Sequence, residues 1–189
     1  MCGGEEVPRI ALVGPMGVGK SSVGRGLSRA LGWPFVDLDA GVEEAAGRSI
    51  ASIFQFDGEQ TFRRMEFQRL HALTTDEQVQ DVVCATGGGV VETSENRMLL
   101  LEHWTTIWLD ADIETLASRV FLDTTTVRPL VHGRDEDSVR RRLHELYLRR
   151  EAWYQEVAQL RVQVSCQTPE QVVDQILQSD LLGHARRWS

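Results

Sequence analysis

Lysine is nearly absent from this sequence of 189 residues: 19 of its 20 basic residues are arginine, and Lys20 is the exception. Lysine is ordinarily among the commonest residues in proteins, so we expect a specific role at the one position that keeps it. The sequence also contains no Asn-Lys-x-Asp element, the type of motif that selects guanine. A GTPase switch is therefore not expected.

Cysteine is scarce too, with three widely spaced thiols at Cys2, Cys84 and Cys166 and no Cys-x-x-Cys pair. This spacing fits neither a disulfide framework nor a zinc site, and it indicates a reducing compartment, of which the cytoplasm is the simplest. No run of about 18 apolar residues occurs. A glycine-rich loop begins at Gly14, too early for a signal peptide to precede it, so we expect neither export nor a membrane span.

Positive charge is in deficit, because 28 acidic residues outnumber 20 basic ones and leave a formal net charge of −8. Nucleic acids and membrane surfaces are polyanions, so we expect neither as a partner. The remaining composition, 42% hydrophobic and 25% charged, is that of an ordinary globular protein. The length suits a single domain over residues 1–189.

Short apolar runs rich in β-branched residues alternate with longer amphipathic stretches, a pattern typical of βαβ units around a parallel sheet. Five strands are predicted, at Arg9–Val13, Phe35–Asp37, Val82–Ala85, Thr105–Leu109 and Arg161–Val164. Helices are predicted at Lys20–Leu31, Gly58–Leu73, Ser94–Glu102, Ile113–Phe121, Glu136–Val157 and Thr168–Gln178. The predicted fold class is therefore α/β.

Two stretches interrupt the simple alternation. Residues 40–60, with glycine breaks at Gly41, Gly47 and Gly58, are predicted to hold short helices where one crossover helix would suffice. Residues 123–137 are rich in Thr, Asp, Arg, Gly and Pro and have few large apolar side chains. We interpret the second stretch as a mobile lid.

The segment from Gly14 to Ser21, GPMGVGKS, fits the motif G-x-x-x-x-G-K-[ST] between a predicted strand and a predicted helix. In such a loop the backbone N–H groups surround an anion at a helix N-terminus. The lysine reaches the β- and γ-phosphates, and the serine hydroxyl binds Mg²⁺. The loop therefore predicts a nucleotide site with contacts from Gly17, Val18, Gly19, Lys20, Ser21 and Ser22.

Two further predicted strands are followed by residues suited to a ligand. Asp37 and Asp39 end the second strand, where alternation would point both carboxylates to one side at the carboxyl edge of the sheet. Gly87, Gly88 and Gly89 follow the third strand and indicate a backbone that something approaches closely. Taken separately, these could be solvated turn residues and a tight turn. Beside a phosphate loop, we interpret them as positions for Mg²⁺ and for substrate hydroxyls.

The most specific block of sequence joins Gly47-Arg48-Ser49-Ile50, Ile53-Phe54, Asp57-Gly58-Glu59 and Phe62-Arg63-Arg64-Met65-Glu66. Together with the aspartate pair, the triple glycine and Arg128-Pro129-Leu130, it resembles the shikimate kinase family from about Ile10 to Leu177. The resemblance implies a P-loop, nucleoside-monophosphate-kinase-like fold of three layers with a five-stranded parallel sheet, a lid and a substrate-binding helical insertion at about residues 40–75. It also implies ATP-dependent phosphorylation of the 3-hydroxyl of shikimate, with Mg²⁺, by a monomer in the aromatic amino-acid pathway.

The resemblance also assigns the acceptor site. Asp39 would bind the substrate hydroxyls, including the one that attacks, and Arg63 and Arg150 would bind the substrate carboxylate. A guanidinium fork suits that task because it forms two parallel hydrogen bonds with a carboxylate and stays charged. Glu66 would hold Arg63 in place. The remaining substrate contacts would come from Gly87, Gly88 and Gly89, with Phe54 and Phe62 beside the carbon ring.

Transfer and nucleotide binding are assigned in the same way. Lys20, Asp39 and Arg128 would be the catalytic residues, with Arg128 carried by the lid onto the phosphates. Ser21 and Asp37 would place Mg²⁺. Arg119 and Gln167 would lie near adenine. The stretch from Arg119 to Arg128 is longer than usual for the family, which is a departure from its pattern.

Two other functions stay open at this stage. A kinase for another small polyol acid, such as gluconate, is disfavoured because both arginines and the triple glycine suit a shikimate-like carboxylate. A catalytically silent nucleotide-binding module would predict a damaged site, whereas the motif residues named above are all present.

Overall fold

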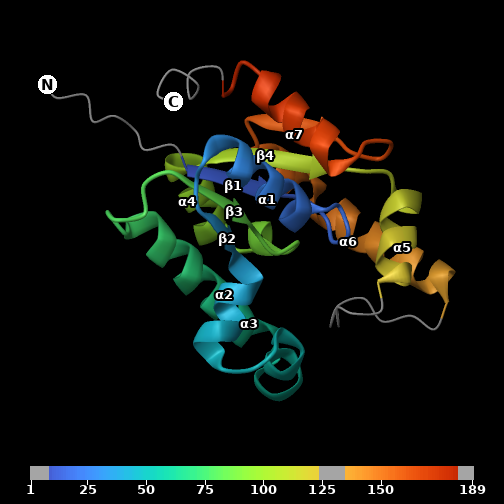
Figure 1. Cartoon of the computed structure of the whole chain (residues 1–189). Helices are drawn as coiled ribbons and strands as arrows, with labels where there is room; N and C mark the ends of the chain where they lie inside the picture. Colours follow the sequence, from blue (N-terminus) through green and yellow to red (C-terminus); the bar gives the residue numbers. More distant parts are fainter. Residues whose placement is uncertain (1–8, 124–134, 183–189) are drawn as a thin grey trace, which may run out of the picture.

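The computed structural model describes residues 9–123 and 135–182, and within them five strands form one parallel sheet in the order β2-β3-β1-β4-β5 (Figure 1). The strands are β1 (Arg9–Val13), β2 (Phe35–Asp37), β3 (Val82–Ala85), β4 (Thr105–Asp110) and β5 (Leu160–Gln163). All five predicted strands are confirmed. Their bounds differ only at β4, which is one residue longer, and at β5, which starts and ends one residue earlier.

Helices cover both faces of this sheet, so the α/β fold has the three layers predicted for it (Figure 1). Alternate residues of β1 face opposite cores. The helices are α1 (Lys20–Leu31), α2 (Leu38–Ala46), α3 (Ile50–Thr75), α4 (Ser94–His103), α5 (Ile113–Leu122), α6 (Glu136–Val157) and α7 (Pro169–Gln178), with a 3₁₀ turn η1 (Val90–Glu92). Ile10 and Leu12 of β1 pack in a cluster with α1, α5 and α7, whereas Ala11 and Val13 pack in a second cluster with α3 and α4.

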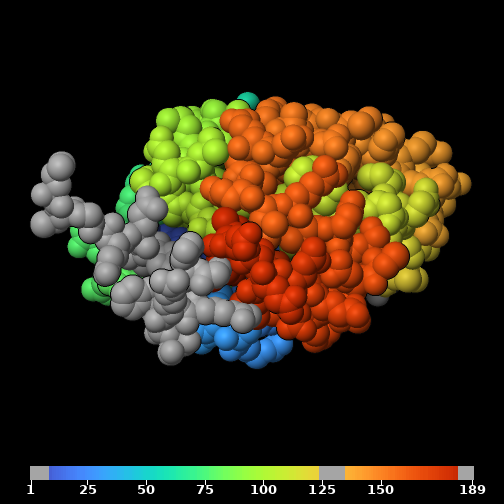
Figure 2. Space-filling model, turned by 90° about the horizontal axis from the view of Figure 1, so that it is seen from above, coloured from blue at the N-terminus to red at the C-terminus, as the bar shows by residue number. Residues whose placement is uncertain are grey.

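Helix α6 joins the two cores. Its first half contributes Val139 and Leu143 to the cluster around α1, and its second half contributes Tyr154 and Val157 to the cluster around α4. Figure 2 shows the later segments of the chain, in orange and red, beside the green segment that contains α4. The C-terminal half of α6 lies against η1, the turn that follows the triple glycine.

The insertion between β2 and β3 contains the predicted short helices, as α2 and as the part of α3 before Gly58. Gly58 has non-helical backbone angles with φ 81°, and α3 is kinked at this residue. A positive φ disfavours residues that carry a Cβ, so glycine suits the position. The predicted helix at Gly58–Leu73 is thus the second, longer part of α3. Both helices pack around a small separate cluster of Val42, Ile53 and Phe62, and they project away from the sheet (Figure 1).

The predicted lid is described only at its two ends. Asp123 caps the C-terminus of α5, and α6 begins at Glu136 with Asp135 as its N-cap, so the last two residues assigned to the lid belong to a helix. Arg128 lies outside the described residues. Across the described ranges, no helix has the length and the apolar character needed to cross a membrane.

Candidate active site

A cavity of about 830 Å³ lies where the carboxyl ends of β1, β2 and β3 meet the insertion. This edge is where open α/β sheets usually bind ligands. The cavity brings together nearly all the predicted site residues of the described ranges, namely Gly17, Gly19, Lys20, Ser21, Ser22, Asp37, Asp39, Arg63, Glu66, Gly87, Gly88, Gly89 and Arg150. Phe54 and Phe62 also line it, with their ring centroids 5.0 Å apart.

The phosphate loop lies between β1 and α1, as its motif requires. Gly17 adopts φ 81°, and a Cβ there would lie 2.7 Å from Cγ2 of Val120, so the loop needs glycine at this position. The Lys20 ammonium is held inside the loop, where its Nζ donates to the carbonyl oxygens of Gly14 (2.8 Å) and Pro15 (2.9 Å). The Val18 side chain is buried in the core, and Val18 is not among the residues that line the cavity.

Ser21 and Asp37 form a pair of oxygen donors beside the loop. The Ser21 hydroxyl donates to Oδ2 of Asp37 at 2.7 Å. Mg²⁺ in nucleotide sites is usually bound by only one or two oxygen atoms of the protein, and its other ligands are waters and phosphate oxygens. No cluster of three or more His, Cys, Asp or Glu side chains that could cage a metal occurs in the described ranges. The donor set therefore fits a magnesium ion shared with a nucleotide.

Asp37 and Asp39 do not both belong to the second strand, so this part of the sequence prediction is wrong. Strand β2 stops at Asp37, and Asp39 belongs to the first turn of α2. The cause is local, because Oδ1 of Asp37 accepts a hydrogen bond from the backbone N–H of Ala40 (3.4 Å) and so caps a helix. Both carboxylates nevertheless line the same cavity.

Two carboxyl groups, Asp39 and Glu66, approach the same point next to Gly87. A Cβ at Gly87 would lie 2.7 Å from Oδ1 of Asp39 and 2.8 Å from Oε1 of Glu66. Neither of these buried oxygens has a hydrogen-bond partner within the part of the chain that is described. Unpaired buried acceptors are unusual in folded proteins, so this pair indicates a place for donors from a ligand.

Burial also changes the titration of these carboxyls. It raises the pKa of Asp39 to about 6, and the nearby Asp37 carboxylate adds to that shift. Burial raises the pKa of Glu66 to about 7, although Arg63 opposes the change. Both groups are thus near their titration range at neutral pH, unlike exposed carboxylates.

The Arg63 guanidinium contacts three carboxylates. Its Nη1 donates to Glu66 (2.9 Å), and its Nη2 donates to Glu59 (3.0 Å) and to Glu92 (2.8 Å). The group also lies over the Phe62 ring, 5.2 Å from the centroid. Burial on its own would lower the pKa of Arg63, but Glu66 and then Glu92 outweigh it and raise that pKa. The contacts fix Arg63 at the cavity wall.

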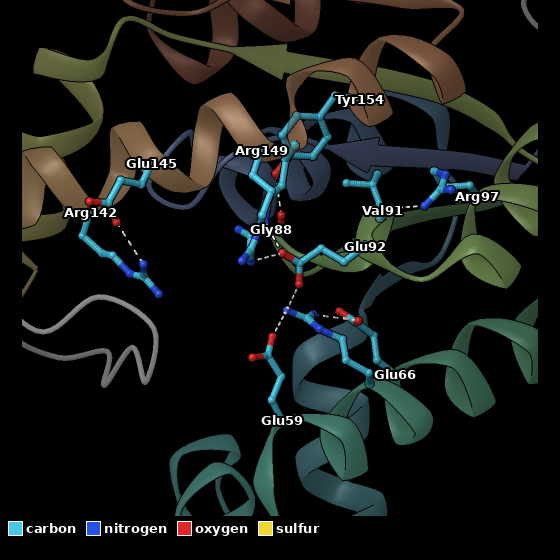
Figure 3. A network of polar contacts seen from close by, with 12 residues as sticks. Glu59, Glu66, Gly88, Val91, Glu92, Arg97, Arg142, Glu145, Arg149 and Tyr154 are labelled. Carbon is cyan, nitrogen blue, oxygen red and sulfur yellow. Dashed lines mark hydrogen bonds and ion pairs between the residues drawn. The ribbon is translucent and has the colours of Figure 1, made fainter.

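Arg150 reaches the same region from α6 and is only 2% exposed. Its Nε donates to Oε1 of Glu92 at 3.0 Å, while its buried Nη2 has no partner among the described residues. Arg149 also contacts Glu92 (Figure 3). Sequence reasoning missed Glu92, whose only signal is its place three residues after the triple glycine.

The triple glycine connects the phosphate loop to this arginine region. A Cβ at Gly88 would lie 3.2 Å from the backbone nitrogen of Met16, and a Cβ at Gly89 would lie 2.6 Å from Cζ of Arg63. The Tyr154 hydroxyl donates to the Gly88 carbonyl oxygen (Figure 3). The glycines are therefore needed for close packing, as expected from the sequence.

Of the two residues predicted to lie near adenine, Arg119 lines the cavity and Gln167 does not. Arg119 lines the cavity and donates to the carbonyl oxygens of Val18 and Val164, each at 3.4 Å. Gln167 is in the turn before α7, where its amide donates to Gln163 and Gln175 (2.7 and 3.1 Å), and it is not among the residues that line the cavity.

Taken together, the residues that line the cavity can bind phosphates, a carboxylate and hydroxyl groups.

Comparisons with known proteins give a consistent family. A family model described as shikimate kinase matches residues 16–180. A shikimate kinase from Parasynechococcus marenigrum is 46% identical over 167 residues, or 88% of this chain and 83% of the relative. One from Zymomonas mobilis subsp. mobilis is 44% identical over 168 residues, or 89% and 90%. The solved structure of a shikimate kinase from Acinetobacter baumannii in complex with shikimate has a TM-score of 0.84 at 32% identity, and the match covers 98% of this chain and 97% of that one.

Proposed function

The chain belongs to the shikimate kinase family, and on that premise we propose that it transfers the γ-phosphoryl group of ATP to the 3-hydroxyl of shikimate, giving shikimate 3-phosphate and ADP. The observation that carries the proposal is one cavity that combines a phosphate loop, an arginine pair and two unpartnered carboxyl oxygens. The phosphate loop suits the phosphates of ATP. The arginine pair suits the carboxylate of shikimate, and the carboxyl oxygens suit its hydroxyl groups.

The acceptor site consists of Arg63 and Arg150 for the carboxylate and Asp39 for the hydroxyls. The unpartnered Nη2 of Arg150 and the cavity position of Arg63 support the first assignment. The unpartnered Oδ1 of Asp39 supports the second. Glu66 holds Arg63 in place, and Gly87, Gly88 and Gly89 contact the substrate through their backbone, with Phe54 and Phe62 beside the ring.

In the transfer step, the 3-hydroxyl oxygen attacks the γ-phosphorus, and the bond to the oxygen that bridges the β- and γ-phosphates breaks. Asp39 accepts the hydroxyl proton. Lys20, the loop amides of residues 17–22 and Arg128 stabilise the charge that develops on the phosphoryl oxygens. Most of the catalysis is positioning and electrostatic stabilisation, as in other phosphoryl transfers.

The reaction would also use Mg²⁺, which Ser21 and Asp37 would hold beside the phosphate loop. The adjacent oxygen atoms of these two side chains support this assignment. The ion neutralises the phosphates of ATP when it is bound.

We further propose a single kinase domain over residues 1–189, with residues 40–75 as the acceptor-binding insertion and 123–137 as a lid that carries Arg128. Gln167 and Arg119 contact the base. The protein acts as a monomer in the cytoplasm. The free thiols of Cys84 and Cys166 support a reducing compartment.

A coupled assay of ADP release tests this function, with shikimate, quinate and gluconate as acceptors and with or without Mg²⁺. We expect turnover that depends on both shikimate and Mg²⁺. Turnover with gluconate and none with shikimate would identify a different polyol-acid kinase, and nucleotide binding without turnover on any acceptor would identify a silent module.

A further inference from the structure

Glu92 forms the centre of an ion-pair network that no motif predicts (Figure 3). Its Oε2 accepts from Arg63 at 2.8 Å, and its Oε1 accepts from Arg150 at 3.0 Å and from Arg149. The two proposed carboxylate-binding arginines, which are 87 residues apart in the chain, therefore share one glutamate.

Glu92 contacts these arginines from outside the cavity. Arg63, Glu66 and Arg150 all belong to the cavity lining, and Glu92 is absent from that lining among the described residues. The buried Nη2 of Arg150 stays unpartnered although its Nε is engaged by Glu92. Glu92 therefore leaves at least one guanidinium donor available to a ligand in the cavity.

The backbone gives Glu92 a fixed position between two helices. It ends η1, which begins directly after Gly89, and η1 packs against α3, which carries Arg63, and against α6, which carries Arg150. A second bond in the same region, from the Tyr154 hydroxyl to the Gly88 carbonyl oxygen, ties α6 to the glycine run. The segment from Gly87 to Glu92 thus connects the two arginine-bearing helices.

Electrostatics keeps this glutamate ionised. Burial on its own would raise the pKa of Glu92, but Arg150 and then Arg63 outweigh it and hold that pKa below its usual range. Two guanidinium groups that face one ligand carboxylate also repel each other, and an anion between them offsets the repulsion. A neutral side chain of the same size would form weaker hydrogen bonds and leave the repulsion in place.

We propose that Glu92 is a positioning residue for the acceptor: it holds Arg63 and Arg150 at the spacing that binds the shikimate carboxylate. This inference rests on the proposed function and adds to it a residue that does not itself touch the substrate. It follows that Glu92 affects the binding of an acceptor only when that acceptor carries a negatively charged carboxylate.

The test compares the wild-type enzyme with Glu92→Gln in the ADP-release assay, using shikimate and its methyl ester as acceptors. Loss of the group that orients a metal ligand typically costs about 10- to 100-fold in affinity or activity. We expect an effect of similar size for a group that orients two arginines, so KM for shikimate should rise at least about tenfold. KM for ATP should stay within about twofold, because Glu92 lies outside the cavity lining. With the uncharged methyl ester, both enzymes should be equally poor.

Two further variants make the comparison specific. Glu156→Gln is a matched control, since Glu156 pairs with Arg97 at 3.2 Å and is not part of the cavity lining. It should leave all constants unchanged. Glu92→Asp keeps the charge but is one methylene shorter, so it should raise KM for shikimate less than Glu92→Gln does. Melting temperatures measured alongside show that each variant is folded.

The outcomes separate the inference from the function on which it rests. An active wild type whose Glu92→Gln variant keeps or lowers KM for shikimate overturns the positioning role. An equal loss on the acid and on the methyl ester overturns it as well, because a general structural defect does not depend on the substrate's charge. A wild type with no shikimate turnover overturns the proposed function and this inference together.

Discussion

Replacing Gly89 with alanine should move the Arg63 guanidinium while leaving the fold in place. Gly89 has φ −108°, which any L-residue can adopt, so the backbone tolerates the change. A Cβ at this position would lie 2.6 Å from Cζ of Arg63 and nearer still to both terminal nitrogens. Non-bonded carbon atoms prefer separations of about 3.5–4.0 Å, so the guanidinium has to move by about 1 Å.

That movement is expected to affect acceptor binding, because Arg63 is held by Glu59, Glu66 and Glu92 and cannot turn away without losing at least one of these bonds. A misplacement of about 1 Å can cost about 100-fold in rate, equivalent to about 2.7 kcal/mol. We therefore expect kcat/KM for shikimate to fall by about 100-fold, mainly through KM, with KM for ATP unchanged. Loss of one charge-assisted hydrogen bond would lower the stability by about 1.5–3 kcal/mol.

Gly41→Ala is the matched control for this variant. A Cβ at Gly41 would lie 2.7 Å from Nε of Arg69, another arginine side chain, but one that does not line the cavity. The assay is ADP release at varied shikimate and ATP, with thermal unfolding measured in parallel. The reasoning would be refuted if Gly89→Ala kept the wild-type KM for shikimate, or if it raised KM for ATP instead.

Three other changes probe separate parts of the site. Arg63→Ala should abolish use of shikimate while leaving ATP binding nearly intact; calorimetry that shows lost ATP binding would move Arg63 to the nucleotide side. Asp37→Asn should raise the Mg²⁺ concentration needed for half-maximal ADP release by about tenfold, and an unchanged requirement would exclude Asp37 from the metal site. The pKa of Glu66 is raised from 4.5 to about 7, so the folded state binds more protons than the unfolded state between these values, and this group's contribution to stability falls as pH rises through that window. The free energy of unfolding, measured in urea, should fall from pH 5 to pH 8 by up to about 3 kcal/mol more for the wild type than for Glu66→Gln. An equal change in the two proteins would contradict the raised pKa.

Much of the fold could be predicted from the sequence because local signals agree with the final structure. The strands are continuous apolar runs since both faces of the sheet are covered. The phosphate loop follows from a strict motif whose glycines and lysine each have a geometric reason. The pairing of Arg63 with Glu66, which the family resemblance implied, connects residues three apart on one helix, a spacing at which side chains meet.

Other features depend on contacts that no local pattern encodes. Asp39 was placed on a strand, but the capping bond of Asp37 starts α2 one residue earlier. Glu92 drew no attention because its partners lie 29 residues before it and 57 and 58 residues after it, and only the packing of η1 between α3 and α6 brings them together.

The most direct test of the central claim is phosphorus NMR of a reaction that contains the enzyme, ATP, Mg²⁺ and shikimate. The account predicts that the γ-phosphate signal of ATP disappears while one phosphomonoester appears in equal amount, attached at the 3-position of the shikimate ring, together with ADP. Release of inorganic phosphate in place of that ester, or an ATP signal that does not change, would contradict it.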